Sequence, residues 1–222
     1  MTDVKTSVNS IKSNAGCGEI LYNKAEKDTA NRKAILAEAI GYLEKALDLY
    51  PTYVNVLNLL ASASFEYDRN YHKTLEYYKR LVAVNPAFPD VYLNLPTILK
   101  YVNDVDFSIK TLEDFHALNP NNYTINYELG ILYGREKNNT DKAIPLLEKA
   151  TQLQPNSADA YNNLGLAYAF SGNLQKALQN FLRAAELKPN DKSIIMNLSI
   201  TYRNLGQEDK AQSLFNKAAS LN

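Results

Sequence analysis

The chain has 222 residues, of which 45% are hydrophobic and 22% are charged, so it is too rich in apolar side chains for a disordered segment. Its 24 Lys and Arg balance its 24 Asp and Glu, which leaves no excess positive charge to hold nucleic acid through phosphates. One cysteine, Cys17, excludes an intramolecular disulfide framework. No apolar run reaches the roughly 18 residues of a membrane span. We therefore predict a folded chain with no nucleic-acid partner and no membrane insertion of its own.

Prolines divide the chain into units of nearly constant length. Pro51, Pro86, Pro120, Pro155 and Pro189 are separated by 35, 34, 35 and 34 residues. Most of them follow an amphipathic apolar run, and each marks the end of a helix. A period of this length is typical of repeats made of two helices. The sequence predicts about six helical hairpins, at 11–53, 54–88, 89–122, 123–157, 158–191 and 192–222.

The N-terminal residues match the border between two hairpins. Val8-Asn9-Ser10 aligns with Pro155-Asn156-Ser157, so we expect residues 1–10 to be the tail of a truncated preceding repeat. Residues 11–222 then form a single domain. The first hairpin carries about nine additional residues, Lys24–Lys33, which either lengthen its two helices or form a loop.

Irregularities mark three of the inner hairpins. The hairpins at 54–88 and 123–157 each contain one residue more than those at 89–122 and 158–191. In 89–122, Pro96 lies well inside the first helix, where it removes a backbone hydrogen bond at a cost of about 3 kcal/mol. We expect a kink there, which is either a tolerated irregularity or a feature that widens the surface lined by the first helices.

The hairpin at 158–191 has the clearest pattern. Tyr161, Leu164 and Tyr168 share one face of its first helix. Ser171-Gly172-Asn173 supplies the turn before the second helix. Eight residues stand at the signature positions of the tetratricopeptide repeat, with tyrosine in place of tryptophan, and the chain resembles this family: Tyr161, Leu164, Gly165, Tyr168, Ala177, Phe181, Ala184 and Pro189.

This resemblance implies an all-α solenoid in which stacked hairpins form a superhelix with a concave surface lined by the first helices. Members of the family are scaffolds, so it also implies a protein or peptide partner. The two histidines, His72 and His116, fall in different hairpins, and the chain has no phosphate-binding loop. We therefore predict no catalytic residue, no cofactor and no metal site.

Asparagines recur at one position of the first helices. Asn94, Asn163 and Asn197 each stand two residues before the small-residue slot of their hairpin. Asn163-Leu164-Gly165 resembles the motif of O-linked N-acetylglucosamine transferase, whose repeat asparagines hold peptide backbones. The alternative is that these amides only satisfy local polar groups. The candidate partner-binding residues of the concave face are Asn94, Asn163, Asn197, Asn162, Asn58 and Glu128.

A second resemblance indicates an alternative function. Residues 2–14 resemble the junction that precedes the repeat domain of bacterial multi-span membrane proteins similar to protein-O-mannosyltransferases. The chain would then be a structural or oligomerisation domain of a membrane enzyme, with homo-oligomers formed through uncapped terminal repeats. If the chain is a domain of such a membrane protein, the resemblance implies an extracytoplasmic location. If it is not, we expect a cytoplasmic location. The identity of the partner does not follow from the sequence.

Overall fold

The computed structural model describes the backbone of residues 2–102 and 104–221, and the side chains of these residues except 2–8, 67 and 68. Across the described residues the structure is helical and contains no strand, as the repeat pattern predicted. The chain divides into two compact units, unit 1 (Met1–Asp104) and unit 2 (Val105–Asn222). This boundary falls inside the predicted hairpin 89–122. The assignment of 11–222 to one domain stays a prediction.

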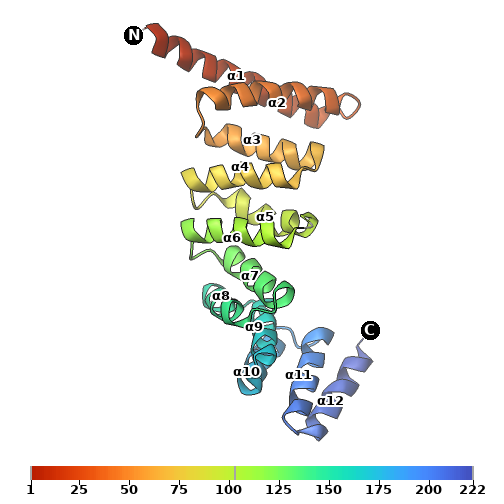
Figure 1. Ribbon diagram of the computed structural model, residues 1–222. Coiled ribbons are helices and arrows are strands. Elements are labelled where there is room, and N and C mark those ends of the chain that lie inside the picture. The colour runs from red at the N-terminus through yellow and green to blue at the C-terminus, as the bar shows by residue number, and fades with distance from the viewer. Residues whose placement is uncertain (1, 103, 222) are drawn as a thin grey trace. The chain divides into compact units, whose positions relative to one another are not determined.

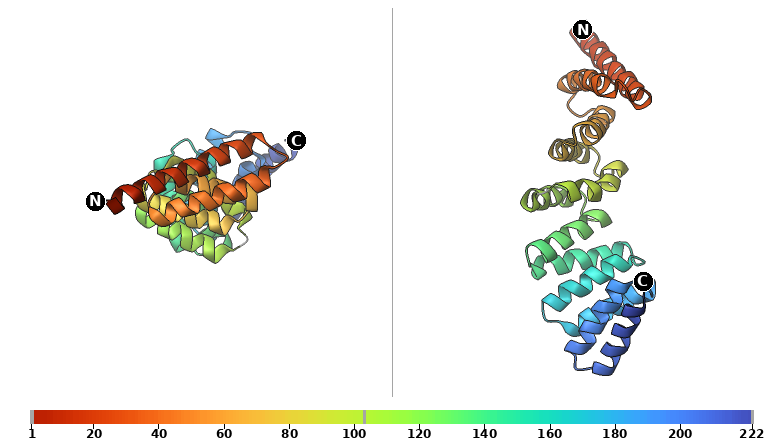
Figure 2. Two further views of the ribbon diagram at one scale, coloured as in Figure 1. Left: turned by 90° about the horizontal axis from the view of Figure 1, so that it is seen from above. Right: turned by 90° about the vertical axis from the view of Figure 1, so that its right-hand side faces the viewer.

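Unit 1 consists of antiparallel helices, each packed against its neighbour in the sequence (Figure 1). Its core contains Leu43, Leu57, Leu60 and Leu81, all fully buried. The views in Figure 2 show α1 and α2 side by side over most of the length of α2. The elements are α1 (Thr2–Lys27), α2 (Arg32–Leu49), α3 (Val54–Ala63), the π-helical turn η1 (Ser64–Asp68), α4 (Tyr71–Val84) and α5 (Pro89–Tyr101).

Unit 2 repeats the same hairpin design. Its first helices, α7, α9 and α11, alternate with its second helices, α6, α8, α10 and α12 (Figure 1). Phe115, Ile125 and Phe181 are among its largest fully buried side chains. The elements are α6 (Val105–Leu118), α7 (Tyr123–Ile131), the π-helical turn η2 (Leu132–Glu136), α8 (Thr140–Leu153), α9 (Ala158–Phe170), α10 (Leu174–Leu187), α11 (Lys192–Asn204) and α12 (Glu208–Ser220).

The N-terminal helix differs from the border predicted at residues 8–10 and shows where the additional residues Lys24–Lys33 lie. We expected a helix to end at Val8-Asn9-Ser10, but α1 runs without a break from Thr2 to Lys27. Position 8 holds valine where the other repeat borders hold proline, so no missing N–H group ends the helix there. The additional residues Lys24–Lys33 lengthen the two helices of the first hairpin, which are joined by a short turn at residues 28–31.

The additional residues of 54–88 and 123–157 lie in the two π-helical turns. Each turn follows the first helix of its hairpin directly, η1 after α3 and η2 after α7. A π-helical turn holds one residue more than an α-helical turn. The extra residue of each 35-residue repeat is therefore absorbed at the end of its first helix, and the second helix starts in register.

Close packing of the two helices of a hairpin depends on a small residue at one slot. A Cβ atom added at Gly165 would lie 2.6 Å from the Phe181 ring, which confirms that glycine permits the close approach of α9 and α10. Pro96 holds the corresponding place in α5, but its ring is exposed, and α5 continues past it to Tyr101.

The second helices α4, α8 and α10 start at similar polar caps. The side chains of Asn70, Asn139 and Asn173 each accept a hydrogen bond from the backbone N–H three residues later. Such a cap satisfies an N–H group that has no partner within the helix, worth about 1 kcal/mol. These caps fix where α4, α8 and α10 begin and so set the position of the turn before each of them.

Candidate functional site

An exposed apolar face lies on the first helices of unit 2. Phe170, the last residue of α9, is 71% exposed, although most aromatic side chains of this size are covered. Beside it, Leu166 of α9 and Ile131 of α7 are half-buried. These three side chains border a small apolar hollow of about 20 Å³, whose other walls are Gly130, Gly134, Arg135, Leu147, Asn163 and Ala167.

The predicted site residue Asn163 lies beneath this apolar face. Its side chain is 7% exposed, and its amide group has a partner on each side. The Nδ2 atom donates to the Tyr127 hydroxyl at 3.0 Å and to the Asp159 carbonyl at 2.9 Å. The Oδ1 atom accepts from the Arg135 guanidinium at 2.7 Å. Asn163 therefore links α9 to α7 and η2 and holds Arg135 at the edge of the hollow.

Asn197 and Asn162 form a similar link between the next two first helices. The Nδ2 atom of Asn197 in α11 donates to the Oδ1 atom of Asn162 in α9 at 2.8 Å. Both side chains are half-buried. Ile200, one helical turn beyond Asn197, is 48% exposed and extends the apolar face onto α11.

In α7, Glu128 takes the place that asparagine has in the other first helices α5, α9 and α11. Its side chain is half-buried. Burial raises the pKa of this carboxyl, and the neighbouring Arg135 guanidinium lowers it in part. The adjacent Tyr127 is also half-buried, and burial raises its pKa to about 12.

The two predicted site residues of unit 1 contact other helices of that unit. Asn94 in α5 donates from Nδ2 to the Tyr78 hydroxyl in α4 at 3.1 Å. Asn58 in α3 donates from Nδ2 to a carboxylate oxygen of Asp90 in α5 at 3.3 Å. In both units the predicted asparagines thus join neighbouring helices. Whether any of them also contacts a partner stays a prediction.

A tyrosine, a lysine and a glutamate close the seams between neighbouring hairpins in unit 2. The Tyr133 hydroxyl donates to Glu113 of the preceding second helix and accepts from Lys142 Nζ at 2.9 Å. Lys142 Nζ also lies 4.5 Å from the centre of the Tyr133 ring. The next hairpin repeats the arrangement with Tyr168, Glu148 and Lys176. These residues stabilise the stack that presents the apolar face.

Sequence reasoning missed the residues that dominate this face. Phe170 stands outside the signature positions, and its exposure depends on where α9 ends. A signal was present, because an apolar aromatic residue directly before a Ser-Gly-Asn turn has no place in the hairpin core. No cluster of metal-ligating side chains occurs among the described residues, and none of their helices is long and apolar enough to cross a bilayer.

Repeated helical hairpins, each packed against its neighbours in the sequence, define a helical-repeat protein of the solenoid class. Three sequence models of the tetratricopeptide repeat match the C-terminal part of the chain, at residues 134–169, 158–191 and 193–222. These matches cover residues 134–191 and 193–222, where the chain resembles the tetratricopeptide repeat in sequence and has its helical-hairpin fold.

Solved structures with the same fold include MamA and YrrB. One MamA structure is 22% identical over 74% of this chain and 89% of its own, with a TM-score of 0.63. MamA from Desulfovibrio magneticus RS-1 is 21% identical over 76% of this chain and 94% of its own, also at 0.63. YrrB, described as a tetratricopeptide-repeat protein with an unusual peptide-binding site, is 21% identical over 81% of this chain and 92% of its own, at 0.64.

No curated protein matched the sequence. The resemblance of residues 2–14 to proteins similar to protein-O-mannosyltransferases thus finds no support. The side chains of residues 2–8 in that stretch lie outside those that the structure describes.

Proposed function

We propose that the chain is a protein–protein interaction scaffold that holds a peptide or a helix of its partner against the first helices of unit 2. The exposure of Phe170 beside Leu166 and Ile131 is the observation that carries this function. Covering a phenylalanine side chain is worth about 1.5–3 kcal/mol. Exposed apolar side chains grouped in this way on a folded protein are typical of interaction sites.

Polar groups on the same helices can orient a partner that binds to the apolar face. The Arg135 guanidinium, held by Asn163, can donate to a carboxylate or a backbone carbonyl of the partner. At the opposite end of α9 from Phe170, Asp159 accepts from Lys188 Nζ at 2.9 Å and could contact a longer partner segment that runs along the helix. In this proposal Asn163 positions Arg135, and the exposed apolar side chains supply most of the affinity. YrrB shares this fold and has a peptide-binding site, which supports a groove of the same kind here.

A library of random peptides displayed on phage tests the proposal directly, because the selection requires no identified partner. Peptides enriched on the parent chain should carry apolar anchor residues. Phe170→Asp should weaken an enriched peptide by about tenfold to a hundredfold, because it removes the main apolar contact. The matched control is Leu182→Asp, which changes a 41% exposed side chain of the second helix α10. Equal losses from both variants, or none from Phe170→Asp, would contradict the proposal.

The same variants separate a scaffold from the alternative of an oligomerisation domain. Molar mass measured over a range of protein concentrations should show a monomer for the parent chain if the face serves a different protein. A dimer that Phe170→Asp dissociates would instead assign the apolar face to self-association. A dimer that persists in Phe170→Asp would place self-association elsewhere.

A further inference from the structure

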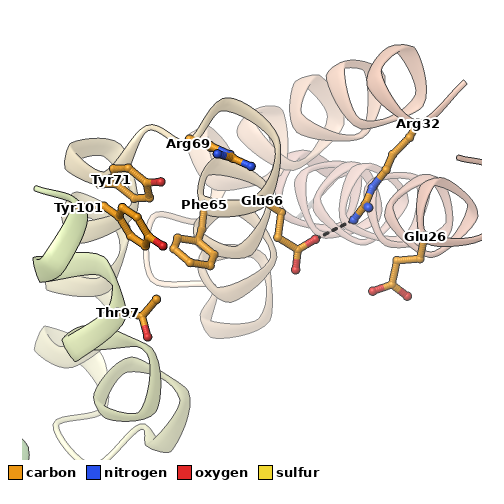
Figure 3. A pocket seen from close by; sticks show the side chains of 8 residues that line it. All are labelled: Glu26, Arg32, Phe65, Glu66, Arg69, Tyr71, Thr97 and Tyr101. Carbon is orange, nitrogen blue, oxygen red and sulfur yellow. Dashed lines mark hydrogen bonds and ion pairs between the residues drawn. The ribbon is translucent and has the colours of Figure 1, made fainter.

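Unit 1 contains a cavity that the predicted site residues do not line. Its volume is about 660 Å³, within the range of sites that hold small molecules or a few residues of a peptide. Figure 3 shows the side chains around it, which come from α1, α2, η1, α4 and α5. The lining residues are Glu26, Arg32, Phe65, Glu66, Arg69, Tyr71, Thr97 and Tyr101.

One end of the cavity is aromatic. The Tyr71 and Tyr101 rings are stacked, with centroids 5.2 Å apart and an interplanar angle of 15°. Phe65 of η1 meets Tyr71 edge to face at 5.9 Å. Tyr101 is 55% exposed, so this aromatic wall is open to a ligand. Such a wall can pack a flat or apolar side chain and exclude water from a neighbouring polar contact.

Some charged side chains of the cavity are paired with one another and others are not. Arg32 and Glu66 form an ion pair at 3.0 Å, which neutralises both. Figure 3 shows that this pair lies between Glu26 and the aromatic end, while Arg69 is on the aromatic side. The Arg69 guanidinium has no ion pair or hydrogen bond with a described side chain, and neither do the hydroxyls of Tyr71, Tyr101 and Thr97. With respect to the described side chains, the aromatic end therefore has one free cation and several free donors.

The backbone of Arg69 is strained. Its φ angle is +47°, in the left-handed region that most residues avoid, at a cost of about 1–2 kcal/mol. The corresponding turns of two later hairpins use glycine, Gly172 at φ +81° and Gly206 at φ +72°, which adopt this conformation freely. Only in this turn does the described chain place a long cationic side chain in such a conformation. Strain of this kind concentrates at functional sites.

We propose that this cavity binds an acidic segment of a peptide, with a carboxylate on Arg69 and the adjacent side chain against Phe65 and Tyr101. A guanidinium pairs with a carboxylate through two parallel hydrogen bonds, and the carboxylate only accepts, so it suits an end of the cavity that is rich in donors. The negative charge of Glu26 at the other end favours a ligand whose own negative charge is confined to the Arg69 side. The site lies wholly in unit 1, so binding there is separable from binding at Phe170.

The test uses three blocked five-residue peptides of glycine with a central phenylalanine, preceded in the chain by one glutamate, one glutamine or one lysine. Titration calorimetry or fluorescence anisotropy with the parent chain should show binding of the glutamate peptide at least tenfold tighter than the other two. Salt at 0.5 M should weaken it, because an accessible ion pair is screened. Equal affinity for the glutamate and glutamine peptides, or preference for the lysine peptide, would overturn the proposal.

Variants of Arg69 then locate the contact. Arg69→Gln should lower the affinity for the glutamate peptide at least tenfold. Arg69→Lys should lower it less, because lysine keeps the positive charge but cannot form the two parallel hydrogen bonds of a guanidinium. Asn138→Gly is the matched control, since Asn138 has φ +50° at the corresponding turn of unit 2 and is outside the cavity. It should leave the affinity unchanged. Unchanged binding by Arg69→Gln, or inorganic phosphate competing as well as the peptide, would contradict a peptide carboxylate site.

Discussion

The two π-helical turns occupy the same place in their repeats but present different chemistry. In unit 2, η2 directs Tyr133 into the seam, where its hydroxyl is bonded to Glu113 and Lys142. In unit 1, η1 places Phe65 and Glu66 beside an open cavity. Each turn is followed by a non-glycine residue with positive φ, Arg69 after η1 and Asn138 after η2.

This difference shows that one extra residue can have two outcomes. Both insertions are absorbed where a first helix ends, so the second helix and its asparagine cap are unchanged. The side chains of the turn are then free to vary. In η2, Tyr133 joins the packing between hairpins and Arg135 borders the apolar hollow, whereas in η1 Phe65 and Glu66 line a polar cavity. Repeat length alone therefore does not decide whether an irregular turn is structural or available to a ligand.

The largest expected effect concerns the helix packing that both insertions leave intact. Gly165→Leu should lower the free energy of unfolding by about 1–3 kcal/mol, because the new side chain overlaps the Phe181 ring. Denaturant unfolding measures the loss. Gly16→Ala is the control, since a Cβ atom there meets nothing within 4 Å. An unchanged midpoint for Gly165→Leu would show that α9 and α10 are not packed in this register.

A smaller effect is expected where unit 2 ties its π-turn to the next hairpin. Asn163→Ala should cost about 1–2 kcal/mol, because it removes the buried partners of Tyr127 and Arg135. Asn197→Ala should cost less, since it removes one bond to the half-buried Asn162. Thermal unfolding compares the two. Equal small losses would mean that the amide of Asn163 is not a link between α9 and α7.

Alkaline pH offers a probe in each unit. Burial raises the pKa of Tyr22 in unit 1 and of Tyr127 in unit 2 to about 12. Unfolded tyrosines lose their protons near pH 10, so the stabilising contribution of each residue is complete below pH 10 and declines between about pH 10 and 12. Tyr127→Phe and Tyr22→Phe should each flatten the fall of stability with pH in this window. Thermal unfolding at pH 9–12 measures how stability falls with pH. If both variants lose stability with pH as steeply as the parent chain, the burial of these hydroxyls is contradicted.

The smallest expected effect is a gain. Arg69→Gly should raise the free energy of unfolding by about 0.5–1 kcal/mol, because glycine adopts positive φ without strain. Asn138→Gly should gain less, since asparagine tolerates this conformation better than arginine. Denaturant unfolding of both variants and the parent decides the order. A loss of stability in Arg69→Gly would show that the guanidinium has a structural role that outweighs its backbone strain.

Much of the fold could be predicted from the sequence, because the signature residues are core residues. The spacing of Tyr161, Leu164 and Gly165 follows from helix geometry, and proline spacing indicated the repeat length. The extra residues of 54–88 and 123–157 were visible as well, although their form as π-turns was not. The N-terminal border was wrong because Val8-Asn9-Ser10 matches a border in its polar residues but lacks the proline that ends a helix.

The candidate sites were harder to predict, because they depend on which side chains find partners. Asn163 was correctly placed on a first helix, but its bonds to Tyr127 and Arg135 join residues 36 and 28 positions apart. Arg69 could have been noticed, since it aligns with Gly172 in a turn that requires positive φ. The cavity beside Arg69, and the partners available to its guanidinium, depend on tertiary packing of α1, α2, η1, α4 and α5 that a single sequence does not show.

The local character of the helix contacts has a kinetic consequence. Within each unit the principal contacts join helices that are adjacent or nearly adjacent in the sequence, as α1 with α2 and α9 with α10. Native contacts therefore close short loops, and proteins of low contact order fold in microseconds to milliseconds. A hairpin can form before distant parts of the chain are in place. Such a chain is expected to fold early during synthesis, as each successive hairpin becomes available to pack on the one before it.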